Sequence, residues 1–130
     1  YLASPMESLE ALQRNYGGFH ARVAEAGHAP VATVPVMRTV YIDEQPARVR
    51  QVKQALVSQA KKFKPSQAAP LDDWALVGSA AFVTDRIHEY QQQLGMTHLI
   101  ASSRLPGVDA DAVVASYERL AKLSLAAPLP

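Results

Sequence analysis

Residues 74–107 constrain the fold of this chain more than any other stretch. A short apolar run ends at Gly78 and Ser79, a helical pattern covers residues 79–94, and a second apolar run covers residues 97–101. A helix that leads into a short buried strand, followed by a loop and another helix, is typical of an α/β fold.

The helix over residues 79–94 is predicted from spacing, because its apolar residues recur on one helical face. Ser79 can cap this helix, since its hydroxyl can accept a backbone N–H of the first turn. Gly78 lets the backbone approach a neighbouring group closely, and a helix N-terminus attracts anions. Two interpretations stay open, an anion site at Gly78 and Ser79 or a simple turn and cap.

Four further elements are predicted from pattern. Ser4 and Glu7 form a capping box at the start of a helix. A run rich in β-branched and aromatic residues predicts a strand. Asp43 or Glu44 can cap a helix with a solvated basic face, and Asp109 can cap the last helix. The predicted ranges are helix 4–26, strand 36–42, helix 44–63 and helix 109–124.

Arg38 stands out within the strand over residues 36–42. In a period-two pattern it shares a face with Val36, Val40 and Ile42. An arginine on an apolar face needs a partner. We expect that partner to be either a carboxylate in an ion pair or a bound anion.

Composition excludes several classes of function. With 130 residues, 48% of them hydrophobic and 19% charged, the chain is predicted to form a single globular domain over residues 1–130. A net charge of +1 gives no electrostatic basis for nucleic-acid binding. No apolar run approaches the roughly 20 residues that span a bilayer, so we expect no membrane partner and a cytoplasmic protein.

No catalytic or metal-binding set is visible in the sequence. There is no cysteine, and the four histidines lack the spacing of metal ligands, so we expect no metal. His98 lies in the strand over residues 97–101, where it is either a structural histidine or part of a pocket wall. Catalytic residues therefore stay unassigned.

Several motifs, in this order and spacing, resemble the C-terminal part of the bacterial-luciferase-like flavin-dependent monooxygenases. The resemblance covers about residues 4–123. It is carried by Val36 to Ile42 followed by Asp43-Glu44, by Val77-Gly78-Ser79 with Val83, by Leu94 to Ile100, and by Arg104 with Pro106-Gly107.

The resemblance implies the C-terminal portion of a (β/α)8 barrel, a fold that takes about 250 residues when complete. Two strands, with residues 74–77 as a third short strand or an extended approach, would pack with about four amphipathic helices. It also implies oxidation of a small organic substrate with FMN or, alternatively, a deazaflavin. Gly78 and Ser79 would hold the flavin phosphate, while Arg104 and His98 would line the substrate pocket.

A partial barrel should leave an open strand edge and an uncovered apolar face. We therefore expect either a homo-oligomer or pairing with an N-terminal barrel half. Two alternative functions stay open: a non-catalytic self-association or interaction module, and a small α/β ligand-binding domain unrelated to barrels.

Overall fold

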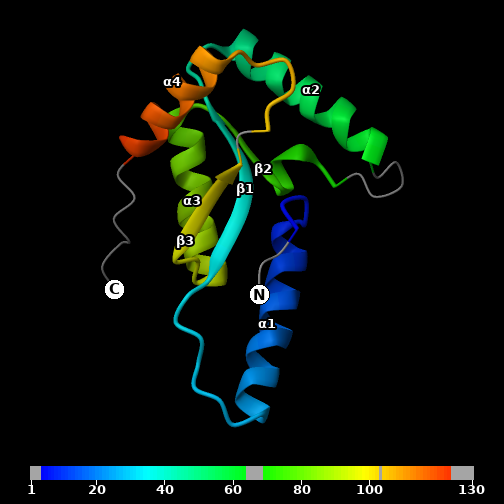
Figure 1. Cartoon of the computed structure of the whole chain (residues 1–130), viewed down its shortest axis with the longest axis vertical. Helices are drawn as coiled ribbons and strands as arrows, with labels where there is room; N and C mark the ends of the chain where they lie inside the picture. The colour runs from blue at the N-terminus through cyan, green and yellow to red at the C-terminus, as the bar shows by residue number, and fades with distance from the viewer. Residues whose placement is uncertain (1–3, 64–68, 103, 124–130) are drawn as a thin grey trace.

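A computed structural model describes residues 4–63, 69–102 and 104–123, and it confirms an α/β fold with three parallel strands and four α-helices. Figure 1 shows the arrangement. The elements in chain order are α1 (Leu9–Glu25), β1 (Pro35–Ile42), α2 (Pro46–Phe63), a 3-10 turn (Leu71–Asp73), β2 (Ala75–Gly78), α3 (Ala80–Leu94), β3 (His98–Ser102) and α4 (Ala110–Ala121).

The sheet has the order β2-β1-β3, and both pairings are parallel. β3 pairs with the first part of β1, from Pro35 to Thr39, and β2 pairs with the last part, from Thr39 to Ile42. The two main predicted strands are therefore neighbours. The segment after Trp74 is a true third strand rather than an extended approach, and it lies on the opposite edge of β1.

Helices pack against both faces of the sheet, but α2 covers its face only over β2 and part of β1, and Ile100 of β3 stays exposed on that face. α1 and α3 pack against one face of β1, where Val36, Val40 and Ile42 are buried. α2 packs against the other face, where its Val52 and Leu56 join a cluster with Tyr41, Trp74 and Val77. The amphipathic stripe of α2 thus covers part of this face, and the expectation of an uncovered apolar face holds over β3.

The first helix begins later than predicted, at Leu9 rather than at residue 4. Its N-cap is Ser8, whose hydroxyl accepts the backbone N–H of Ala11 at 3.1 Å. The carbonyls of Pro5 and Glu7 instead accept hydrogen bonds from the Arg38 guanidinium, at 3.1 and 2.5 Å. The segment before the helix forms a turn instead, in which the Glu7 N–H donates to the Ser4 carbonyl at 3.2 Å.

Arg38 therefore has neither of the partners expected from the sequence. It is fully buried, and its guanidinium is held by neutral groups, namely backbone carbonyls and the Tyr90 hydroxyl at 3.0 Å. The guanidinium also lies 5.3 Å from the centre of the Tyr90 ring, within the range of a cation–π contact. Arg38 ties the segment before α1 to the sheet.

The caps of α3 and α4 agree with the sequence prediction, but Glu44, predicted as a possible cap of α2, contacts α3 instead. Ser79 caps α3, Asp109 caps α4, and Gly95 ends α3 with a left-handed φ of 68°. α2 begins at Pro46 rather than at residue 44, and Glu44 caps α3 instead of its own helix. The predicted end of the last helix, residue 124, lies outside the described residues.

Among the residues that the structure describes, no strand pairs with the outer edge of β3. Ile100, at the middle of this strand, is 39% exposed, and His98 is exposed as well. Within the described ranges, no helix is both long enough and apolar enough to cross a membrane.

Candidate functional site

The carboxyl ends of the three parallel strands lie at one end of the sheet. Ligands in α/β folds bind at this end, because loops and helix N-termini converge there. β1 ends at Ile42, β2 ends at Gly78, and β3 ends at Ser102. Two of the predicted site residues, Gly78 and Ser79, lie at this end of the sheet, and Arg104 follows the end of β3.

The N-terminus of α3 already holds an anionic group of the chain. The Ser79 hydroxyl accepts the N–H of Phe82 at 3.1 Å, and the Glu44 carboxylate accepts the N–H of Ala80 at 2.9 Å. A Cβ added at Gly78 would lie 2.7 Å from a ring carbon of Phe82, so glycine here makes room for that ring. The observed contacts are thus the Ser79 cap and the carboxylate of the chain's own Glu44, and binding of an external anion stays a prediction.

A cavity of about 280 Å³ lies beside Ser79, between the end of β1 and the first turns of α2. Its wall carries the cations Arg50 and Lys53 as well as the acids Asp43 and Glu44. The Lys53 ammonium lies 3.4 Å from an Asp72 carboxylate oxygen. A phosphate in this cavity would therefore face the carboxylates of Asp43 and Glu44 as well as the two cations.

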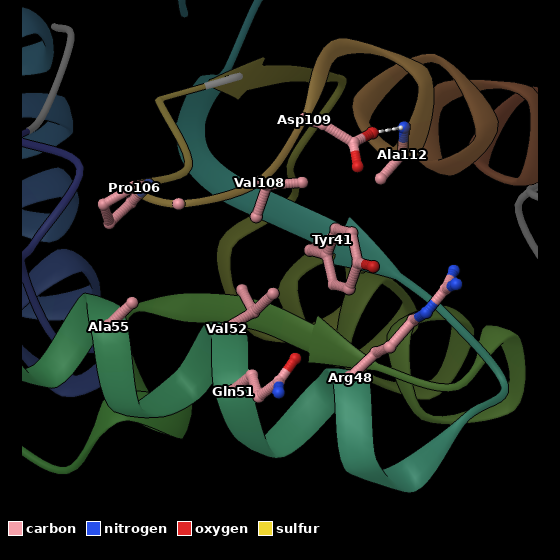
Figure 2. A pocket seen from close by; sticks show the side chains of 10 residues that line it. Tyr41, Arg48, Gln51, Val52, Ala55, Pro106, Val108, Asp109 and Ala112 are labelled. Atoms are coloured by element: carbon pink, nitrogen blue, oxygen red, sulfur yellow. Dashed lines mark hydrogen bonds between the residues drawn. The ribbon is translucent and has the colours of Figure 1, made fainter.

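A larger cavity, of about 440 Å³, lies where the loops after β1 and β3 diverge (Figure 2). The chain leaves β1 through α2 toward β2, and it leaves β3 through α4 on the other side of β1. Such a divergence is where open α/β sheets bind ligands. Tyr41, Val52 and Val108 form part of its apolar wall, and Arg48, Gln51 and Asp109 supply polar groups.

Tyr41 and Asp43 form a hydrogen-bonded pair at the end of β1. The Tyr41 hydroxyl donates to the Asp43 carboxylate at 2.8 Å, and the Arg48 guanidinium lies 3.7 Å from the same oxygen. Burial, then the hydrogen bond to Asp43, raises the pKa of Tyr41. Burial opposes ionisation of Asp43, but the Gln45 N–H, the Tyr41 hydroxyl and nearby arginines outweigh it and lower the pKa of Asp43.

Arg104 lines a third cavity, of about 200 Å³, on the face of the sheet that α2 covers. Thr39 of β1 and Ser102 of β3 are partners in the strand register and lie side by side in its floor. Trp74, just before β2, and Leu56 of α2 form part of the apolar wall. Arg104 therefore lines a cavity, and the substrate-pocket role that the resemblance implies stays a prediction.

His98 is not brought together with the other predicted residues. It begins β3, opposite Pro35 in the register, and so lies at the amino end of the sheet. Its side chain is exposed, and its Nδ1 lies 2.8 Å from the Thr97 hydroxyl. Among the described residues, no group of three or more acids and histidines is arranged to hold a metal.

Sequence reasoning did not assign Tyr41, Arg48, Gln51 or Trp74 to a site. Only Tyr41 could have been found from the sequence. It lies one residue before the end of a predicted strand, and sites in parallel sheets form at the carboxyl ends of strands. Arg48 belongs to the basic face of α2, which the sequence analysis predicted to be solvated. Periodicity alone cannot show that a loop more than 50 residues later, beginning at Arg104, lies opposite that face.

The fold matches part of a solved flavin enzyme. The match is with a type II Baeyer–Villiger monooxygenase, the oxygenating constituent of 3,6-diketocamphane monooxygenase from the CAM plasmid of Pseudomonas putida, in complex with FMN. The TM-score is 0.68 at 21% sequence identity, and the match covers 99% of this chain and 42% of that one. The chain thus spans less than half of that luciferase-like enzyme. No family model and no curated protein matches the sequence.

Proposed function

We propose that this chain is a segment of a cytoplasmic flavin-dependent monooxygenase of the luciferase-like class that acts on a small organic substrate. One observation carries the proposal, namely that nearly the whole chain superimposes on part of a luciferase-like FMN monooxygenase. The cavities beyond the carboxyl ends of the strands support it, because that end of an α/β sheet is where cofactors and substrates bind.

The cavity beside Ser79 is the proposed site of the FMN phosphate. The Ser79 hydroxyl, the first N–H groups of α3, and the side chains of Arg50 and Lys53 would surround an anion there. Gly78 keeps the approach to the helix open. Exposed Glu44 would give up its hydrogen bond to Ala80 when the phosphate enters.

In this proposal the flavin supplies the redox chemistry, and the chain supplies binding and orientation. This division fits the described residues, among which the buried titratable groups at this end of the sheet are Tyr41 and Asp43. Arg104 lines the pocket for the small organic substrate. A deazaflavin, which would exchange hydride, is the alternative cofactor.

The test is a titration of the purified chain with FMN, riboflavin and a deazaflavin, followed by flavin fluorescence. We expect saturable FMN binding, weaker riboflavin binding because riboflavin lacks the phosphate, and a loss of this difference in Lys53→Gln. Gln92→Ala, an exposed change on α3, is the control. Failure of FMN and the deazaflavin to bind at any concentration would refute cofactor binding by this chain.

The exposed edge of β3 favours a second candidate function. β3 pairs with β1 on one side only, and its Ile100 is exposed, so the chain can act as an association module, either with its own copies or with an N-terminal barrel half. In that case the chain would complete a fold rather than carry a reaction, and the flavin titration separates the two functions.

A further inference from the structure

We propose that the cavity beside Arg104 is a binding site for a small organic carboxylate with a compact apolar body. This inference deepens the proposed function, since it names a chemical class for the substrate pocket. It is built from the cavity's own residues and does not require the flavin.

The cavity carries hydrogen-bond donors that have no partner in the described part of the chain. Thr39 is 92% buried, lines the cavity, and its hydroxyl makes no hydrogen bond there. The indole N–H of Trp74, itself 6% exposed, and the guanidinium of Arg104 are likewise without a described acceptor. Arg104 is exposed, and the polar atoms of Thr39 and Trp74 are not among the sealed atoms of the interior that lack a partner. All three donors can therefore reach a molecule that enters the cavity.

The described lining contains no acidic side chain, so the cavity offers donors and one full positive charge. An arginine guanidinium matches the two oxygens of a carboxylate, and the hydrogen bonds that form are charge-assisted. Neutral donors such as Thr39 and Trp74 can complete the shell of such a group. A cationic ligand would find no counter-charge here.

The apolar part of the wall determines the size and polarity of the rest of the ligand. It is formed by Pro5, Met6, Leu56, Ala60 and the ring of Trp74. A volume of about 200 Å³ lies below the roughly 300–1,000 Å³ of typical ligand pockets, so the cavity suits a compact ligand rather than a flavin. A single saturated or aromatic ring bearing one carboxylate has the required size and polarity.

Trp74 is the only tryptophan in the chain and lies in the cavity wall, so its fluorescence reports directly on occupancy. The probe is cyclohexanecarboxylate, and the matched neutral probe is cyclohexanecarboxamide. Both are titrated into the flavin-free chain, with calorimetry run in parallel so that an unresponsive indole does not conceal binding. We expect saturable binding of the carboxylate and about tenfold weaker binding of the amide.

Three variants complete the experiment. Arg104→Gln should weaken carboxylate binding about tenfold and bring it close to that of the amide, and Thr39→Val should weaken both probes several-fold. Arg14→Gln, an exposed change on α1, should leave binding unchanged. No binding by either method, equal affinity for the two probes, or unchanged binding in Arg104→Gln would overturn the inference. Since flavin is absent, each of these results leaves the FMN titration standing as a separate test.

Discussion

The Glu44 carboxylate accepts the backbone N–H of Ala80 at 2.9 Å, so a residue at the end of β1 caps the helix that follows β2. The proposed phosphate site at Gly78 and Ser79 therefore has a competing anion. Replacing Glu44 with glutamine removes the charge and keeps the side-chain length. We expect Glu44→Gln to bind FMN several-fold more tightly than the natural chain, measured by flavin fluorescence.

The stability of the Glu44→Gln variant should fall by no more than about 1 kcal/mol, since a charge at an exposed helix N-terminus contributes about that much. Glu25→Gln, an exposed change at the end of α1, is the matched control and should leave FMN affinity unchanged. If Glu44→Gln weakens FMN binding, the phosphate does not lie at the start of α3.

These contacts show which features a sequence can predict. The caps Ser79 and Asp109 were predicted correctly, because a cap involves residues three positions apart. The partners of Glu44 and Arg38 were not, because they lie more than 30 residues away and depend on which strands pair. A capping box is also local, yet the box predicted at Ser4 is absent. The helix begins at Leu9, and the carbonyls of Pro5 and Glu7 accept hydrogen bonds from Arg38.

The residues that line the cavities also depend on contacts between distant parts of the sequence. The resemblance and the period-two pattern of β1 were enough to predict the fold class and the strand ends. They were not enough to place α2 over the sheet face carrying Tyr41 and Thr39, since an amphipathic helix fits either face equally well. The resemblance was enough to predict that Arg104 lines a pocket. Trp74 and Leu56, which line the same cavity, were not predicted, because that depends on where α2 packs.

Asp43 should make stability depend on pH in the acid range. Its pKa is lowered in the folded chain, so its contribution is present above the unfolded value near 3.8 and is lost as pH falls through the folded value. Urea unfolding between pH 7 and pH 3 should show a smaller acid-dependent loss for Asp43→Asn than for the natural chain. Asp85→Asn, an exposed change on α3, should keep the natural profile.

The neutral cage around Arg38 should make this residue important for stability. Arg38→Met fills the space but leaves the carbonyls of Pro5 and Glu7 without donors, and each such loss costs about 1–3 kcal/mol. We expect Arg38→Met to lose about 3 kcal/mol in urea unfolding. Arg14→Met, on the exposed face of α1, should change stability by less than about 0.5 kcal/mol. A loss equal to that of the control would mean that residues 4–7 are not anchored by Arg38.

The open edge of β3 should cause the chain to associate. An edge strand carrying an exposed Ile100 is a template for another strand, and lysine on such an edge opposes pairing. Light scattering should therefore give the purified chain a mass above the 14.1 kDa of a monomer, rising with concentration. Ile100→Lys should shift the mass toward the monomer, whereas Val57→Lys, at a similarly exposed position on α2, should not. A natural chain that stays monomeric at all concentrations, or an equal shift in both variants, would show that this edge is not the contact.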